Sequence, residues 1–345
     1  MSEDCGVVRI ETVDPREDSS FREWFEVVEV ADAFARPGEP GVLHHEEQRA
    51  SVDALRPGAD SRHVLLAAHD DDRCVGAARV ELPQRDNLHT CEVELVVHPD
   101  ARRRGVGRAL CGQVERVARE QGRTAAAGYA DEPPGSEGRS AGRLAALALG
   151  WEVAQEEARR DIDVPIEPDR ATSLEASCLP YAVDYAIRTW VDRCPDDLVD
   201  DRAELSRIIS TDVPLDGLDW REEAWDAARV RRGEDRAAAM DRTLVNAGAV
   251  HLPTGRMVAY TQLAVPRPRP ERAYQWDTVV SAQHRGHRLG TLVKLAALRQ
   301  LSDRSPGTRF ASTWNAQENT PMIRVNDALG ARINGGLATV QKVLS

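Results

Sequence analysis

The stretch "VVHPDARRRGVGRAL", Val96–Leu110, joins a strand-like start, a proline, a run of arginines and two glycines to a helix-like end. A second stretch, "VVSAQHRGHRLGTLV", Val279–Val293, has nearly the same layout. Arg102 matches Arg285, and Glu94 and Asp277 lie at the same distance before these arginines. Matched order and spacing predict an internal duplication of one strand–turn–helix unit.

The surrounding sequence supports this duplication. Before the first turn, strands are expected at Val7–Glu11, His63–Ala68, Val75–Leu82 and Cys91–Val97. In the last of these, alternate residues are apolar on one face, and the helix after the turn repeats apolar residues at Val106, Leu110, Val114 and Val117. A strand near Thr124–Tyr129, a helix over Ala141–Leu149 and a strand from Trp151 complete the first half.

The second half shows a similar order after a linker at Val164–Arg170. Residues 175–245 are expected to be mostly helical, and their aromatic residues could wall a binding pocket or simply pack between helices: Tyr181, Tyr185, Trp190 and Trp225. The later elements are a hairpin turning at Thr254-Gly255, a strand at Tyr274–Val280, a helix with Leu289, Val293 and Ala297 inward, a strand at Arg309–Trp314, a helix at Thr320–Leu329 and a last strand.

The pattern predicts a mixed α/β chain of two similar domains, residues 1–165 and residues 166–345. Each domain is expected to hold a mostly antiparallel, twisted sheet flanked by helices, and the second domain to begin with a helical segment. Two domains also suit a chain of 345 residues.

Composition excludes several classes of function. A net charge of -12 argues against a nonspecific nucleic-acid binder, because phosphate contacts need a basic face. No apolar run is long enough for a membrane span, and the acidic N-terminus does not resemble a signal peptide. The six cysteines form no CxxC pair and no zinc spacing, so we expect reduced, mostly buried thiols, no metal site and a cytoplasmic location. The arginine- and alanine-rich composition is typical of a GC-rich bacterial genome.

The turn itself is suited to an anion. Gly105 and Gly107 allow a tight bend at the start of a helix, where several backbone N–H groups point into one concavity. A dinucleotide-binding fingerprint would need Gly or Ala where Leu110 stands, and a P-loop would need Gly-Lys-Ser/Thr. The turn therefore predicts a pyrophosphate site of another kind, or a plain turn with solvated arginines. His98, His284 and His287 flank the two turns and are expected to contact phosphates or solvent.

The pattern V-x-P-x-x-R-x-x-G-x-G at Val97–Gly107 resembles that of the GNAT superfamily of acetyl-coenzyme A-dependent N-acyltransferases. With the looser second copy, the chain resembles tandem GNAT proteins, a layout similar to that of mycothiol synthases. The second copy departs from the pattern, since Arg288 replaces the first loop glycine and Ala282 replaces the proline.

The resemblance implies which residues hold the cofactor, acetyl-CoA or another acyl-CoA. Main chain near Val97 and Val280 would pair with the pantetheine arm where the sheet splays. Backbone amides of both turns would hold the pyrophosphate, at Arg103, Arg104, Gly105, Val106, Gly107 and Arg108, and at Gly286, His287, Arg288, Leu289, Gly290 and Thr291. Arg102 and Arg285 complete the predicted cofactor-binding set.

The resemblance also implies a carboxylate beside the thioester, and Glu94 and Asp277 occupy that position. Either acid could instead be a solvated strand residue. The tyrosine that such enzymes use as general acid is replaced by Ala146 and Asn326. Asn319 could brace the pantetheine or cap a helix.

We therefore expect an N-acyltransferase that acts on a primary amine of a small molecule, with the chemistry in the second half, as a monomer or homodimer. The alternatives are a non-catalytic acyl-coenzyme A-binding module and an acetyltransferase of protein N-termini or lysines.

Overall fold

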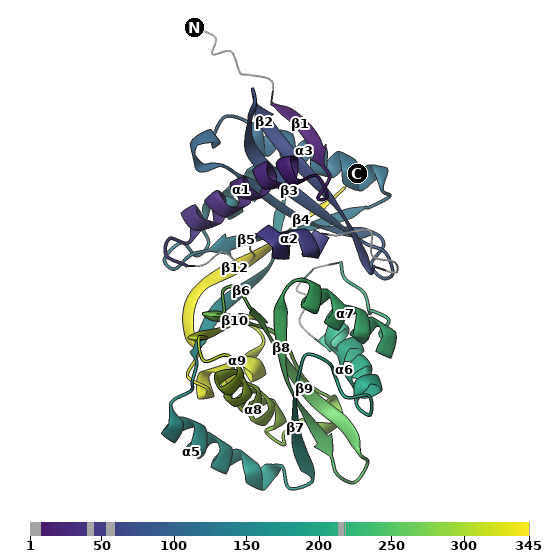
Figure 1. Ribbon diagram of the computed structural model, residues 1–345, viewed down its shortest axis with the longest axis vertical. Coiled ribbons are helices and arrows are strands. Elements are labelled where there is room, and N and C mark those ends of the chain that lie inside the picture. The colour runs from purple at the N-terminus through teal and green to yellow at the C-terminus, as the bar shows by residue number, and fades with distance from the viewer. Residues whose placement is uncertain (1–7, 40–44, 53–58, 213–216, 218, 345) are drawn as a thin grey trace. The chain divides into compact units, whose positions relative to one another are not determined.

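The structure is a computed structural model that describes residues 8–39, 45–52, 59–212, 217 and 219–344. The chain divides into two compact units (Figure 1). Unit 1 comprises residues 1–156, 215–220 and 337–345, and unit 2 comprises residues 157–214 and 221–336. The C-terminal end thus folds with the first unit. A domain boundary after residue 165 stays a prediction.

Unit 1 is built on a sheet with helices on both faces. Its strands are β1 (Arg9–Val13), β2 (Ser61–Asp70), β3 (Arg73–Pro83), β4 (Thr90–Val97), β5 (Ala125–Glu132), the start of β6 (Glu152–Asp163) and the end of β12 (Arg332–Val343). Its helices are α1 (Asp18–Ala35), α2 (His45–Val52), the short 3-10 helix η1 (Pro99–Ala101), α3 (Val106–Glu120) and α4 (Ala141–Ala148).

The sheet of unit 1 runs in the order β1-β2-β3-β4-β5-β12. Strands β1 to β4 pair antiparallel, and β4 and β5 pair parallel. Phe21 and Trp24 of α1 fill the core on one face. Leu110 and Val114 of α3 fill the core on the other face. The alternation predicted for Cys91–Val97 is confirmed, because Cys91 and Val93 lie in the α3 core while Val96 packs against the α1 core.

Unit 2 repeats this plan. Its strands are the end of β6, then β7 (Tyr185–Val191), β8 (Arg242–His251), β9 (Arg256–Pro266), β10 (Arg272–Val280), β11 (Phe310–Ala316) and the start of β12. Its helices are α5 (Pro168–Cys178), η2 (Leu179–Tyr181), α6 (Val199–Asp212), α7 (Ala227–Ala239), η3 (Ala282–His284), α8 (Leu289–Arg304) and α9 (Thr320–Ala328).

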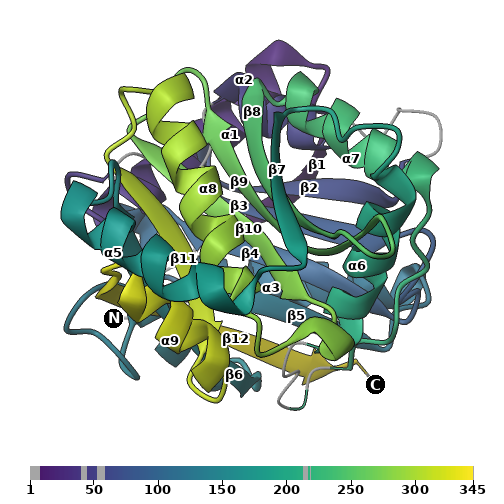
Figure 2. The same ribbon diagram turned by 90° about the horizontal axis from the view of Figure 1, so that it is seen from below.

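The sheet of unit 2 runs in the order β6-β11-β10-β9-β8-β7. Its strands pair antiparallel except β10 with β11, which are parallel. Helices α5, α8 and α9 cover one face, and α6 and α7 cover the other (Figures 1 and 2). In both units, a strand therefore leads through a turn into a helix that crosses the adjacent sheet face.

The predicted fold class is confirmed, as are the hairpin turn at Thr254-Gly255 and the inward face of the second-half helix. The expectation that residues 175–245 are mostly helical is wrong in part. Tyr185 and Trp190 lie on strand β7, whose residues are mostly aromatic or β-branched and therefore favour a strand. Val117 is only half-buried, and Ala118 takes its place in the core.

Two further expectations can be checked against the described residues. Cys5 lies outside them, but the other five cysteines are all buried free thiols, as predicted. Burial raises the pKa of Cys74 to about 11 and of Cys91 and Cys194 to about 12, which makes these thiols poor nucleophiles. No described helix is long and apolar enough to cross a membrane.

The two turns share one backbone shape but place glycine differently. Arg103 and Gly105 have left-handed φ angles of 66° and 88° in unit 1. At the equivalent places in unit 2, Gly286 and Arg288 have φ angles of 86° and 58°. Each turn thus has one glycine and one arginine in the left-handed region, which residues other than glycine adopt at a cost in free energy. The looser second copy therefore keeps the backbone of the first.

We predict that Gly105→Ala lowers the free energy of unfolding by about 1 kcal/mol, because a Cβ is strained at φ 88°. Gly112→Ala is the matched control on the same helix. It lies in an exposed interior turn of α3 with open space around it, so it should stabilise by roughly 0.5–1 kcal/mol. Urea unfolding of both variants measures the difference, and equal effects would contradict the role of the turn.

Candidate active site

Both turns present the N-terminus of a long helix after a strand end. Gly105 and Arg288 are the N-cap residues of α3 and α8, and neither supplies a side-chain hydrogen bond to the first turn of its helix. The first N–H groups of an α-helix have no partner within the helix, and the helix dipole makes this end attractive to anions. The predicted amide positions are thus brought together in each turn.

The arginine of each motif holds its own turn. Arg102 Nε donates to the carbonyl oxygen of Val97 at 3.2 Å, and Arg285 Nε donates to that of Val280 at 3.3 Å. These two bonds tie the start of the turn to the end of the strand in both units. Because the two units share this geometry, both side chains have a structural role in holding the turn. Another arginine of this turn forms an ion pair, because Arg104 Nη1 lies 3.9 Å from Asp70 Oδ2.

In each unit, the strand before the turn parts from its parallel neighbour. Pairing of β4 with β5 spans Thr90–Val93 of β4, although β4 continues to Val97. Pairing of β10 with β11 spans Arg272–Tyr274, although β10 continues to Val280. The splay that was expected at the cofactor site is therefore present in both units, and it leaves main-chain groups of β4 and β10 available.

Strand β10 carries a bulge that β4 does not. Its register with β9 shifts between Gln275 and Asp277, whereas β4 pairs with β3 in regular register from Glu92 to Val97. The extra residue is Trp276, whose side chain is 41% exposed. Bulges often re-aim side chains beside active sites. The bulge redirects the residues around Asp277 at the point where β10 and β11 have parted.

Asp277 has a defined set of partners. The buried Tyr260 hydroxyl donates to Asp277 Oδ2 at 2.6 Å, and Arg202 Nη2 lies 3.5 Å from the same oxygen. Arg202 also stacks over the Tyr260 ring at 3.7 Å. Burial raises the pKa of Tyr260 well above its ordinary value, so this hydroxyl remains a donor. Sequence reasoning missed Tyr260 and Arg202, which come from β9 and α6, far from Asp277 in the sequence.

Aromatic residues line the parted strands of unit 2. The rings of Tyr274 and Trp314 stack with centroids 6.4 Å apart. The buried Arg242 guanidinium lies 5.8 Å from the Tyr274 ring and 5.5 Å from the Trp276 ring. Trp276 and Trp314 thus lie on the two strands that part.

The acids of unit 1 form a different cluster. Glu94 is paired with Arg79 at 2.5 Å and its side chain is half exposed. Glu92 faces Glu81 across β3 and β4, and Tyr129 donates a hydrogen bond to Glu92 at 3.1 Å. Burial, with Glu81 opposite, raises the pKa of Glu92 to about 7. Sequence reasoning gave Glu92 no role, although two carboxylates in register across a ladder signal a perturbed group.

The asparagines of the late helix occupy two kinds of position. Asn319 is the N-cap of α9 and accepts a hydrogen bond from the Met322 amide at 3.3 Å. Asn326 is fully buried, and its Nδ2 donates to Asn315 Oδ1 at 2.6 Å. The cap reading of Asn319 is thus realised, while a pantetheine contact stays a prediction. In unit 1, Ala146 packs against the α3 core.

The flanking histidines have protein partners. In unit 2, His284 Nδ1 lies 2.9 Å from the Tyr185 hydroxyl, and its ring stacks edge-on with His251. His287 Nδ1 lies 2.9 Å from the Tyr181 carbonyl oxygen. Burial and the neighbouring histidines lower the pKa of His284. In unit 1, His98 caps η1 by accepting from the Asp100 amide.

One buried lysine was not anticipated. Lys294 of α8 is 1% exposed, and burial lowers its pKa to about 7. A signal was available, since Lys294 is one of two lysines in the chain and stands in the apolar run "TLVKLAAL". The residues that the structure describes include no group of three or more His, Cys, Asp or Glu side chains suited to a metal ion.

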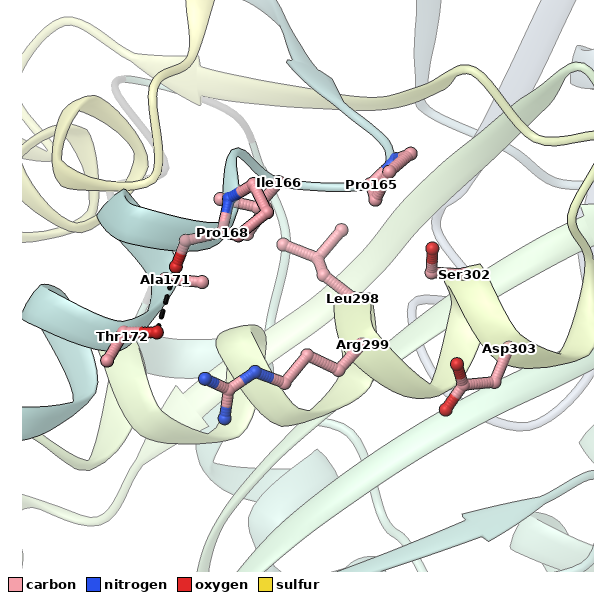
Figure 3. Close-up of a pocket in the computed structure, with 9 residues that line it drawn as sticks. All are labelled: Pro165, Ile166, Pro168, Ala171, Thr172, Leu298, Arg299, Ser302 and Asp303. Atoms are coloured by element: carbon pink, nitrogen blue, oxygen red, sulfur yellow. Dashed lines mark hydrogen bonds between the residues drawn. The ribbon is translucent and has the colours of Figure 1, made fainter.

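A surface pocket of about 400 Å³ lies elsewhere in unit 2 (Figure 3). Its lining joins the N-terminal part of α5 to Leu298, Arg299, Ser302 and Asp303 near the C-terminal end of α8. Since an α-helix rises about 1.5 Å per residue, the pocket lies well away from the turn at the N-terminal end of α8. It is therefore no part of the candidate active site.

Comparison with known proteins agrees with this geometry. Residues 24–132 match the acetyltransferase (GNAT) family model. Mycothiol acetyltransferase of Sanguibacter keddieii is 27% identical over 279 residues, which cover 79% of each chain. A tandem GNAT protein from the clavulanic acid biosynthesis pathway is 26% identical, with a TM-score of 0.78 over 98% of this chain and 99% of that chain.

A more distant structure shows the fold alone. A GCN5-related N-acetyltransferase from Sphaerobacter thermophilus is 15% identical, with a TM-score of 0.65 over 100% of this chain and 97% of that chain. The similarity therefore extends over both units, beyond the part matched by the family model.

We predict that Glu92→Gln stabilises the protein more at pH 8 than at pH 5. Because the pKa of Glu92 is raised from 4.5 to about 7, the folded state holds an extra proton between these pH values. Stability then falls as pH rises through this window, and the glutamine removes a cost of roughly 1–3 kcal/mol above pH 7. Urea unfolding at both pH values measures it. Glu152→Gln, at an exposed position, is the control. If Glu92→Gln changed the free energy of unfolding equally at pH 5 and pH 8, the raised pKa would be contradicted.

Proposed function

The chain is a tandem GNAT protein of the acetyltransferase class, and from this premise we propose that it transfers an acetyl or other small acyl group from coenzyme A to a primary amine of a small molecule. The observation that carries the proposal is the strand–turn–helix beside parted parallel strands, which occurs in both units. In such a site, the amides at the helix N-terminus can bind a pyrophosphate. The unpaired edge of the strand can bind an extended arm. Acetyl-coenzyme A would supply an activated thioester.

The residues of both turns fit a bound pyrophosphate. A Cβ at Gly107 would meet only Val97 Cγ2 at 3.6 Å, and a Cβ at Gly290 would meet Val280 Cγ2 at 3.7 Å and Val325 Cγ2 at 3.9 Å. These are ordinary contacts, and neither residue has a positive φ. The protein's own backbone therefore does not require glycine at either position. Close approach of a ligand to the helix N-terminus is the reason we propose for both.

The acceptor chemistry is assigned to unit 2. An ammonium ion is attracted to a carboxylate and must lose a proton before its nitrogen attacks the thioester carbon. Both contacts of Asp277 converge on Oδ2, so Oδ1 is the oxygen we assign to the amine, directly or through water. The N–C bond forms, the C–S bond breaks, and the thiolate leaves as the thiol after protonation. Trp276 and Trp314 would exclude water and contact the apolar part of the acceptor.

We predict that Asp277→Asn lowers kcat by about 10²- to 10⁴-fold, because the amide cannot accept the proton. The assay follows release of free thiol from acetyl-coenzyme A with a panel of small primary amines. Asp303→Asn, at the far end of α8, is the control that should retain activity. If Glu94→Gln abolishes activity while Asp277→Asn does not, the chemistry belongs to unit 1. If no amine in the panel releases thiol, the proposed function is wrong.

We also predict that Gly107→Ala and Gly290→Ala each weaken coenzyme A binding to their own unit by about tenfold without lowering stability. The added methyl group meets no tight contact in the protein but would stand against the bound pyrophosphate. Calorimetric titration measures affinity and stoichiometry, and urea unfolding measures stability. Gly112→Ala, farther along α3, should bind as the unchanged protein does. Full affinity in both loop variants would place the phosphates elsewhere.

A further inference from the structure

The bulge in β10 decides on which face of the sheet Asp277 lies. Asp277 lies opposite Gln262, which is two residues from Tyr260 on β9 and so shares its face, towards α6. A regular ladder would place Trp276 opposite Gln262 and turn Asp277 to the other face. On that face, Leu263 belongs to the apolar core beneath α8, where a carboxylate would be costly and would lose its bond from Tyr260. The position of Asp277 therefore depends on what holds the bulge.

The side chain of Gln275 bonds main-chain groups of both strands at the bulge. Its Nε2 donates to the Gln262 carbonyl oxygen of β9 at 2.6 Å and to the Asp277 carbonyl oxygen of β10 at 2.9 Å. A carbonyl oxygen can only accept, so these two contacts identify the atom as the amide nitrogen and use its two hydrogens. One side chain therefore ties together the two residues that lie opposite each other at the bulge.

Two threonines complete this arrangement. The buried Thr261 Oγ1 lies 3.0 Å from Gln275 Nε2 and 3.1 Å from the Asp277 carbonyl oxygen. Thr278 Oγ1 lies 2.8 Å from the same carbonyl oxygen and 2.7 Å from Thr261 Oγ1. Gln275 lies opposite Leu263, and Thr278 lies opposite Thr261, so this network lies on the α8 face. It holds the main chain of Asp277 from the face opposite to the carboxylate.

In unit 1, a valine stands where unit 2 has Gln275. Val93 lies opposite Val80, one residue before Glu94, and it belongs to the core beneath α3. Gln275 lies opposite Leu263 as the last residue before the bulge. Strand β4, with the valine, pairs in regular register, whereas β10, with the glutamine, bulges. Within this one chain, the amide side chain thus accompanies the bulge.

We propose that Gln275 is a positioning residue for acyl transfer in unit 2. Its side-chain amide fixes the bulge in β10 and so keeps the Asp277 carboxylate on the α6 face, beside Tyr260 and Arg202. This inference rests on the proposed function, in which Asp277 accepts the proton of the amine. An apolar residue in place of Gln275 would leave both carbonyl oxygens without this donor, and β10 could then pair in the regular register.

Gln275→Met tests the inference, because methionine has nearly the same length but no hydrogen to donate. We expect kcat to fall by about tenfold to a hundredfold, because a displaced carboxylate no longer meets the amine. The KM for acetyl-coenzyme A should change by less than about twofold, since the amides of the second turn are untouched. Gln275→Glu keeps the shape of the side chain, but its carboxylate would face two carbonyl oxygens, so kcat should fall at least as far. Release of free thiol in the full-length protein measures both constants.

A double variant separates a positioning role from a general loss of stability. If Gln275 acts through Asp277, Gln275→Met should have little further effect on kcat once Asp277→Asn is present. A general loss of stability would lower kcat in both backgrounds, and urea unfolding shows whether each variant is folded under the assay conditions. Gln113→Met, at a half-buried position of α3 in unit 1, is the matched control and should retain the kcat of the unchanged protein.

Three results would count against the inference. If both Gln275 variants keep full kcat while Asp277→Asn does not, the inference is overturned and the proposed function stays intact. An equal fall in kcat with and without Asp277→Asn would also overturn it, since the amide would then act independently of Asp277. If the unchanged protein releases no thiol with any amine, the proposed function fails and the inference fails with it.

Discussion

The parting of two parallel strands is the constraint on which each unit depends. Once β4 leaves β5 and β10 leaves β11, main-chain groups lose their ladder partners, and the chain must turn at once into a helix. Arg102 and Arg285 tie the two turns to the strand ends through equivalent bonds. The parting therefore places a helix N-terminus beside one unpaired strand edge, an arrangement that suits a phosphate-bearing chain.

The two copies satisfy this constraint with different residues. Unit 1 places arginine at the first left-handed position and glycine at the second, and unit 2 reverses them. A motif that requires glycine at one fixed place therefore underrates the second turn, because the backbone shape has survived while the glycine has moved. The copies differ more at the strand before the turn, where only β10 bulges. The bulge, more than the loop, distinguishes their chemical capacity.

How far the sequence could lead depended on whether a feature was local. The strand–turn–helix, the hairpin at Thr254-Gly255 and the inward face of α8 follow from short-range patterns, and all were predictable. The partners of Asp277 were not, because Tyr260 and Arg202 lie on other elements and no periodicity connects them. Strand β7 was missed because it is short and lacks a regular alternation of buried and exposed residues.

Polar groups whose charged forms are disfavoured show where the units depart from a design for stability alone. In unit 1, Glu92 faces Glu81 across the ladder, and in unit 2 Lys294 lies in an apolar helix without a partner. Folding alone would favour apolar residues at both positions, since a group whose charged form is disfavoured costs free energy at some pH. Glu92 lies on β4, just before that strand parts from β5, and Lys294 lies on the helix that follows the second turn, so in each unit the cost falls within the strand–turn–helix. Such a distribution is what a ligand would produce if its own polar groups completed the interactions that the protein leaves open.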